Sequence, residues 1–436
     1  MIEIFNIVLS LLVLLIISSS PLSSNFYKKK LSYGQYSYFD RLSLNFLFNT
    51  YILLLISFTN INYSYFFIFL ILSSLIINYF YSNKNYFYFL RDKNNLFFLF
   101  ANVLIFFYIA ADPTLSWDGL ENWYFKAQNF FYNYNFFDLK NIPGLDYYPH
   151  LGTFLWGFFW KNSLLQYEYL GRFVNIFIFL LSIFSITSLL SKDDYLKPII
   201  TALLILLCFD VFLFRGYQEI LVFSFFIFIS KYFYLFILNK NKFSLLVCFL
   251  FLNILPWLKN EGYIFVFIFT LSLLFLINKI PQKKEVLLFI FLSWVLIAIK
   301  KFIFFKFLNL NMFHASDFKF SLDLYILASF FLLLAKGFVV AFFKYKIYIF
   351  LLISFLFLFK TKNIQKQYLN FINFLKINLL LYVLMIIFIY LSIINDPRGI
   401  NWWIDNSLDR ILYEISGFFL ISIILIINLK KNYILK

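Results

Sequence analysis

The sequence predicts an all-α integral membrane protein, a polytopic bundle of about 12 to 14 transmembrane helices. Three observations lead to this fold class. Of the 436 residues, 63% are hydrophobic and only 13% are charged, whereas a soluble domain carries about 25% charged residues. The mean hydropathy of the chain is +0.84. The apolar residues also form runs of helix length, and a helix satisfies its own backbone hydrogen bonds in lipid.

The apolar runs follow one another along the chain, and no stretch is long or polar enough for a separate soluble domain. We therefore expect residues 1–436 to form a single polytopic membrane domain. The first run resembles a signal peptide in length, but Glu3 stands where a basic residue is usual, so we expect a membrane helix with its N-terminus outside. The expected helices cover 4–20, 44–60, 64–81, 95–111, 172–190, 197–214, 219–237, 243–257, 262–278, 286–304, 320–342, 346–359, 372–394 and 411–429.

The formal net charge of +16 raises the question of nucleic-acid binding. The basic residues, however, cluster in short loops between apolar runs, which is the positive-inside pattern of membrane proteins, and we expect no nucleic-acid partner. The cysteines Cys208 and Cys248 lie inside apolar runs and predict neither a disulfide nor a metal site. The loops expected on the cytoplasmic face of the cell (inner) membrane are 28–41, 84–93, 240–242, 279–284 and 430–431.

Residues 112–171 are expected to form one long loop on the outer, periplasmic face. The segment 149–160 within it is apolar but short. A run of about 10–14 residues is more typical of an interfacial or re-entrant helix than of a full crossing, and only this interpretation keeps the later basic loops inside through Lys284. One conflict is left, because the basic residues near 344–346 and 360–366 cannot both be cytoplasmic if the run between them crosses fully.

The first polar cluster lies in "TLSWDGLENWYFKAQNFF", residues 114–131, directly after a membrane helix. Asp118, Asn122 and Lys126 are spaced by four, so a helix would present them on one face, with Glu121 beside them. Such a face offers a carboxylate, an amide and an ammonium group to a polar ligand. The alternative is an interfacial amphipathic helix whose tryptophans lie at the level of the lipid headgroups.

A second cluster lies in "LDYYPHLGTFLW", residues 145–156, where Asp146 and His150 flank a proline. Proline is well tolerated in the first turn of a helix, so Pro149 is expected to open the juxtamembrane helix. A lone histidine such as His150 is more often packed or hydrogen-bonded than catalytic, and both interpretations are kept open.

The third and fourth clusters are "FRGYQEIL", residues 214–221, with Glu219, and "LPWLKNEGYIF", residues 255–265, with Lys259 and Glu261. Charge at membrane depth is costly, so such residues usually face a polar cavity or a partner. Lys259 and Glu261 are two positions apart and point away from each other on a helix, so we expect them to reach different partners. A short outer turn between two helices is the alternative.

The fifth cluster, "NDPRGINWWIDNSLDRIL", residues 395–412, is again expected outside. It contains Arg398 and Arg410, whose forked guanidinium groups suit phosphate. Several polar clusters on one membrane face are a stronger signal than any one of them. An acidic residue that can act as a base, cations for phosphate and a lipid-facing helix together suit transfer of a group from a lipid-linked phosphate donor.

The order of these motifs resembles the GT-C fold glycosyltransferases, which include protein mannosyltransferases and the lipid A aminoarabinose transferase. The matching stretches are the acidic "WDGLENWYFKA" after a membrane helix, the Tyr-Pro segment "DYYPHLGTF", then Arg172, "GYQEIL", "WLKNEG" and "SLDRIL". The resemblance covers residues 95–280 and 396–412. Where such proteins usually continue the Tyr-Pro segment with proline or an apolar residue, this chain has His150.

The resemblance implies a GT-C type bundle that moves a sugar from a polyprenyl-phosphate donor to a hydroxyl acceptor on the outer face, with inversion. It places the catalytic acidic residue at Asp118, where it activates the acceptor or organises a divalent metal, and Glu121 is the neighbouring candidate. No other cofactor is implied. The candidates for binding the donor phosphate or substrate are Lys126, Tyr148, His150, Glu219, Lys259, Glu261, Arg398 and Arg410.

Two other classes of membrane protein remain as alternatives. A transporter or flippase would be expected to carry charged residues through the membrane depth and repeated halves, and neither feature is evident in the sequence. An O-antigen polymerase or ligase also uses lipid-linked sugars, but its large loop usually comes late in the chain. Here the long outer loop comes early, which favours the GT-C class.

Overall fold

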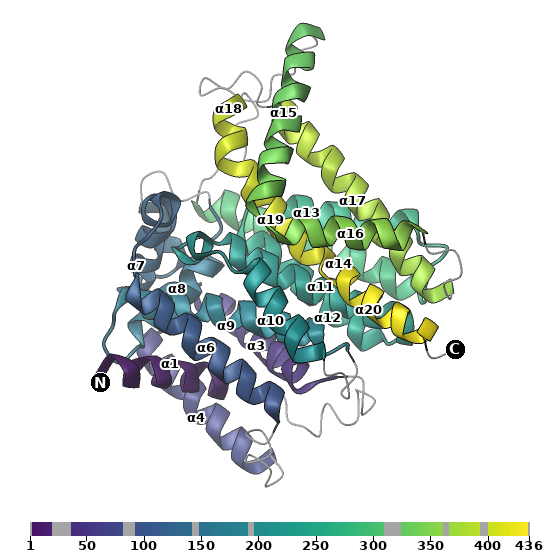
Figure 1. Ribbon diagram of the computed structural model, residues 1–436. Coiled ribbons are helices and arrows are strands. Elements are labelled where there is room, and N and C mark those ends of the chain that lie inside the picture. Colours follow the sequence, from purple (N-terminus) through teal and green to yellow (C-terminus); the bar gives the residue numbers. More distant parts are fainter. Residues whose placement is uncertain are drawn as a thin grey trace. The chain divides into compact units, whose positions relative to one another are not determined.

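A computed structural model describes residues 2–19, 36–81, 92–141, 148–190, 196–308, 324–360, 366–392 and 400–434 (Figure 1). Within these ranges the chain is helical and contains no β-strand. The chain divides into two compact units. Unit 1 consists of Met1–Ser224 with Trp257–Asn260, and unit 2 consists of Phe225–Pro256 with Glu261–Lys436. The candidate residues Asp146 and Arg398 lie outside the described residues.

Nine helices in the described part of the chain are long and apolar enough to cross a membrane, or up to ten with a bent pair counted as one span. The prediction of a polytopic helical membrane protein is therefore confirmed. The number of spans is lower than the expected value of about 12 to 14. Three apolar runs form helices of only 13, 17 and 14 residues, which is short of the ~20 residues that a straight span needs. They are α10 (Leu196–Cys208), α12 (Lys242–Leu258) and α13 (Gly262–Phe275).

Unit 1 is built around α9 (Glu168–Thr187), which is buried along its whole length. Between Arg172 and Thr187 this helix has no charged residue, so every face can pack against a neighbour. Its partners in the unit are α1 (Ile2–Ser19), α3 (Tyr38–Ile56), α6 (Lys93–Ala111), α8 (Leu151–Lys161), α10 and the short 3₁₀ helix η3 (Val211–Phe214). A further helix, α4 (Tyr63–Tyr81), packs on α1.

Aromatic side chains hold α6 and α9 together. Phe106 stacks on Phe173 with 4.0 Å between ring centroids, and Phe98 meets Phe177 edge-on at 5.7 Å. Since lipid tails are as apolar as these rings, burial gains little in a membrane, and helix association depends on close packing instead. These phenylalanine pairs therefore contribute to the packing of α6 on α9.

The segment expected to form a juxtamembrane helix is helical as α8 (Leu151–Lys161), which begins two residues after Pro149. It follows the π-helix η1 (Gly119–Tyr124), α7 (Phe125–Phe131) and the 3₁₀ helix η2 (Phe136–Asn141) in the chain. Inside unit 1, α8 packs between α7 and α9, and all its residues from Leu151 to Trp160 are buried. This packing explains why a twelve-residue segment can be so apolar without spanning the membrane. Its orientation in the bilayer stays a prediction.

Unit 2 contains most of α11 (Glu219–Asn239), followed by α12 and α13. Its remaining elements are α14 (Lys283–Leu308), α15 (Leu324–Lys344), α16 (Ile347–Lys360), α17 (Lys366–Ser392), α18 (Ile400–Trp403), η5 (Ile404–Leu408), α19 (Asp409–Phe419) and α20 (Ile421–Ile434). Between α15 and α16 the chain bends by 103° (Figure 1). Since α16 has only 14 residues and leaves the direction of α15, the two helices form either one broken span or a re-entrant loop. The side of the membrane on which each flanking basic group lies stays a prediction.

Candidate functional site

The beginning of the first loop is fastened to the segment that precedes α11. Ser116 donates from both its backbone nitrogen and its hydroxyl group to the carbonyl oxygen of Arg215, at 2.9 Å in each case. The Arg215 guanidinium group in turn pairs with Asp112. Two stretches about a hundred residues apart in the chain are thereby joined through one arginine.

Two glycines make this junction tight. A methyl group on Gly119 would collide with the carbonyl oxygen of Arg215, so only glycine allows the two backbones to approach this closely. Gly216 has a φ of +99°, in the left-handed region that other residues rarely adopt. A methyl group there would also lie 3.1 Å from the Trp156 ring. The junction therefore also touches α8.

Arg172 holds the same junction together through several contacts. Its side chain is 1% exposed and pairs with Glu168 through Nε, at 2.9 Å. Its guanidinium group also donates to the carbonyl oxygens of Pro113, at 2.6 Å, and Phe214, at 3.1 Å. Arginine is the side chain that can make these contacts at once, because its five N–H donors form a rigid fork.

Asp118 lies at the start of the helical part of this loop and is half-buried. Asn122 donates to its Oδ1 at 3.1 Å, as expected for side chains four positions apart on a helix. Glu121 is exposed to solvent. Residues Gly119–Tyr124 form a π-helix, a rare element that is frequent at functional sites.

Lys126 does not share the exposed face predicted for it. It is completely buried, and its Nζ donates to the carbonyl oxygen of Tyr148 at 2.7 Å. The wide π-helical turn before it changes the angular spacing on which the predicted face depended. Lys126 thus joins α7 to the start of the Tyr-Pro segment, where the Tyr148 ring packs edge-on against Trp123 with centroids 5.3 Å apart.

His150 takes the packed, hydrogen-bonded position that the sequence left open. Its ring is fully buried, and its Nε2 lies 2.9 Å from the hydroxyl oxygen of Ser57. Aromatic rings surround it, among them Phe136 at 4.5 Å and Trp257 at 5.8 Å between centroids. His150 therefore helps to hold the residues just before Lys259 against the Tyr-Pro segment.

Glu219 and Lys259 meet in the interior of unit 1. Lys259 Nζ lies 3.1 Å from Glu219 Oε1, and the two side chains are 9% and 2% exposed. The neighbouring Gln218 is completely buried and lies so close to α8 that a methyl group on Gly152 would collide with its amide oxygen. Neither Gln218 amide atom forms a hydrogen bond within the described structure, which leaves this amide open to a polar ligand or water molecule.

Four of the predicted clusters therefore meet within unit 1. The acidic loop touches Arg215 and Gly216, the chain then continues to Glu219, and Glu219 pairs with Lys259. Helix α8 packs against Gly216 through Trp156 and against Gln218 through Gly152. The sequence motif "FRGYQEIL" drew attention to Glu219 but not to Arg215. The sequence signal for Arg215 was the glycine that follows it, because an isolated glycine can indicate a close approach of two backbones.

The two remaining described candidates, Glu261 and Arg410, belong to unit 2. Arg410 donates from Nε to the carbonyl oxygen of Asn406 at 2.8 Å. Lys259 pairs with Glu219, whereas Glu261 is the N-cap residue of α13.

Electrostatic effects follow from these contacts. The Thr114 hydroxyl group, which donates to Asp112 at 2.6 Å, and the neighbouring Arg215 hold the pKa of Asp112 below its ordinary value. Burial and the nearby Glu168 carboxylate raise the pKa of Tyr124. At neutral pH the loop is therefore anchored by a charged Asp112.

The residues present do not form a ready metal site. Among the described residues, no group of three His, Cys, Asp or Glu side chains comes together, and Asp118 has an amide rather than a second carboxylate beside it at Oδ1. We therefore derive no step through a metal ion.

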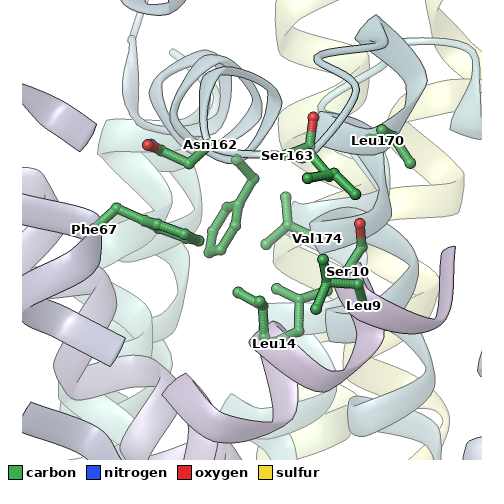
Figure 2. Close-up of a pocket in the computed structure, with 11 residues that line it drawn as sticks. Leu9, Ser10, Leu14, Phe67, Asn162, Ser163, Leu170 and Val174 are labelled. Atoms are coloured by element: carbon green, nitrogen blue, oxygen red, sulfur yellow. The ribbon is translucent and has the colours of Figure 1, made fainter. Parts of the chain in front are cut away.

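A pocket in unit 1 lies between α1, α4, α8 and α9. Figure 2 shows its largely apolar lining, with Leu14, Phe67 and Val174 around the space and Asn162 and Ser163 at one side. Its volume of about 40 Å³ is far below the roughly 300–1,000 Å³ of ligand pockets. We assign no substrate to it.

The fold and the composition together define a class. The chain is a multi-pass helical membrane protein with a buried, charged junction in unit 1. It matches no protein-family model, no curated protein and no solved structure.

Proposed function

We propose that the protein is a membrane glycosyltransferase of the GT-C type, which moves a sugar from a polyprenyl-phosphate-linked donor to a hydroxyl acceptor on the outer face of the membrane. The observation that carries the proposal is the meeting of the acidic loop, α8, Arg215 and the Glu219–Lys259 pair within unit 1. Sugar transfer from a phosphate needs a carboxylate near cations, and this junction has both.

In the proposed reaction the acceptor oxygen attacks the anomeric carbon of the sugar. A new carbon–oxygen bond forms as the bond from that carbon to the phosphate oxygen breaks, and the anomeric centre inverts. Asp118 takes the proton of the acceptor hydroxyl group, a role that suits its half-buried position at the start of the π-helix. Asn122 orients the carboxylate through its hydrogen bond.

The phosphate leaves with the bonding electrons, so the donor side needs positive charge more than an acid. Arg215 is the best-placed cation in unit 1, because its side chain is 33% exposed, whereas Lys259 is buried against Glu219. We therefore place Arg215 at the phosphate and give Lys259 a supporting role. Arg410, which belongs to unit 2, and Arg398, which lies outside the described residues, stay predictions from the sequence alone.

Mass spectrometry of lipid-linked glycans tests the proposal in cells that make the wild-type chain, the Asp118→Asn chain or neither. We expect the product to be lost and the donor to accumulate without the protein. Asp118→Asn keeps the hydrogen bond to Asn122 but cannot take the proton, so transfer should fall by about 10²- to 10⁴-fold. Asp138→Asn is the matched control. Asp138 is a half-buried acid of the same loop, and its carboxylate accepts a hydrogen bond from the backbone N–H of Asn135.

The outcomes separate the function from the assignment of the base. Glycans that are identical with and without the protein would overturn the glycosyltransferase proposal. Near wild-type transfer by a correctly inserted Asp118→Asn protein would remove Asp118 alone, and Glu121→Gln would then be the next variant to measure.

A further inference from the structure

Unit 2 contains a hollow whose lining residues have no part in the proposed reaction. Its walls come from the end of α11, the turn between α13 and α14, and the first part of α17. The volume is about 730 Å³, within the roughly 300–1,000 Å³ of small-molecule sites. The loops beside it, 240–242 and 279–284, are those that the charge pattern predicts to be cytoplasmic.

The polar lining of the hollow suits an anion. Among the described residues it consists of two lysines and three asparagines, with no acidic side chain: Lys240, Lys279, Asn278, Asn370 and Asn373. Ammonium groups and amide N–H groups are donors for phosphate oxygens. The donors come from three separate segments of the chain and converge on one space.

The positive charges of Lys240 and Lys279 are available to a ligand. Among the described residues, neither Lys240 nor Lys279 forms an ion pair with a carboxylate. The acidic residue of the adjoining turn, Glu285, pairs with Lys242 instead. Lys283 adds a further cation to the rim through its hydrogen bond to Asn278 Oδ1, at 2.9 Å. The rim is therefore electropositive.

The rim is also preformed, because two side-chain amides join its three segments. Gln282 Nε2 donates to the carbonyl oxygen of Lys240 at 2.7 Å, and Asn370 Nδ2 donates to that of Lys279 at 2.8 Å. Both lysine backbones are thus held in place before any ligand arrives, which lowers the entropy lost on binding.

The remaining lining is apolar. Ile237 and Leu369 line the same hollow, and Leu369 is 42% exposed. A free phosphate ion would use only the lysines and asparagines. An amphiphile with a phosphate next to hydrocarbon would use both halves of the lining, and such molecules form the membrane that surrounds the protein.

We propose that this hollow binds the headgroup of an anionic phospholipid, with the phosphate between Lys240 and Lys279 and the start of the acyl chains against Ile237 and Leu369. The site joins α11, the α13–α14 turn and α17 through one lipid. It is separate from the proposed transfer reaction and does not depend on it.

Native mass spectrometry of the full-length protein in detergent tests the site, with dioleoyl phosphatidylglycerol and dioleoyl phosphatidylcholine as probes. We expect the wild-type protein to retain one phosphatidylglycerol in preference to phosphatidylcholine. The Lys240→Gln/Lys279→Gln variant should bind phosphatidylglycerol about tenfold more weakly or worse, since lysines near an anionic surface act nearly independently. Lys240→Arg/Lys279→Arg should keep the affinity. Lys346→Gln, an exposed lysine elsewhere in unit 2, is the matched control and should bind like the wild type.

Three results would overturn the proposal. The first is equal binding of the two phospholipids by the wild-type protein. The second is an unchanged affinity in the Lys240→Gln/Lys279→Gln variant, with its melting temperature showing that it is folded. The third is inorganic phosphate that binds with the same lysine dependence while phosphatidylglycerol does not bind, which would assign the hollow to a free anion.

Discussion

Lys259 and Glu219 form an ion pair, with 3.1 Å between Nζ and Oε1, although 40 residues separate them in the chain. The pair joins the turn after α12 to the first residue of α11. Both side chains are almost completely removed from solvent, so the ion pair offsets part of the cost of burying the two charges. Their separate appearance in two sequence motifs thus has one structural explanation.

The first prediction concerns this pair. Glu219→Gln and Lys259→Met should each lower the free energy of unfolding by about 3–5 kcal/mol, because each leaves a buried charge without its partner. The double variant should be clearly more stable than the sum of the two losses implies. Denaturant unfolding of the four purified proteins in detergent gives the coupling. Strictly additive losses would show that the two charges act independently.

The second prediction concerns the junction of the loop with Arg215. Gly119→Ala introduces a methyl group against the Arg215 carbonyl oxygen and should cost about 1–3 kcal/mol through displaced backbone. It should also reduce sugar transfer, since Asp118 is adjacent. Leu120→Ala is the control, because Leu120 is 44% exposed and should change stability little. Melting temperature and transfer are measured on both, and a harmless Gly119→Ala would mean that the loop yields easily.

The third prediction concerns pH. The pKa of Asp112 is lowered by Thr114 and Arg215, so the charged form stabilises the folded loop at neutral pH. This contribution should persist as pH falls and be lost only below the ordinary carboxyl pKa, as Asp112 takes up a proton. Hydrogen exchange of the amides at 112–118, corrected for intrinsic rates, should show protection that disappears in this acidic range. The Asp112→Asn variant should show weaker amide protection that does not change over this acidic range. A variant with the same pH profile as the wild type would show that Asp112 is not the group responsible.

The fourth prediction concerns the membrane topology. The charge pattern places residues 112–171 outside and the 279–284 loop inside. A membrane-impermeant maleimide should therefore label Leu164→Cys in intact cells but Lys284→Cys only after permeabilisation; Leu164 and Lys284 are both exposed. The native cysteines are buried and should not interfere. Labelling of both positions from the same side would refute the predicted topology.

The helical membrane architecture was predictable because hydrophobic run length is a strong signal. The runs at 172–190 and 219–237 correspond closely to α9 and α11, whose faces are all buried. The number of spans was not predictable in the same way. Helices α10 and α13 are as apolar as the candidate spans and differ from them only in length. Helix ends depend on tertiary packing, which hydropathy does not contain.

The candidate site was predictable in its motifs but not in its internal contacts. The clusters of Asp118, Glu219 and Lys259 could be recognised because charge in an apolar chain stands out. The inward position of Lys126 could not, because a π-helix precedes it and its effect on angular spacing is invisible in the sequence. The structural role of Arg172 could not be predicted for a different reason. Most of its hydrogen-bond acceptors are backbone carbonyl groups, and every residue has such a group whatever its side chain.

The glycine positions of the junction have a consequence for tracing distant relatives. A phenylalanine in the core of unit 1 can be exchanged for leucine with modest repacking, so most of this sequence is free to drift. A side chain at Gly119, Gly152 or Gly216 would instead strike a neighbouring segment. Descendants of the same ancestor are therefore expected to share this spacing of three small residues, together with an arginine just before the last, long after their overall similarity has faded.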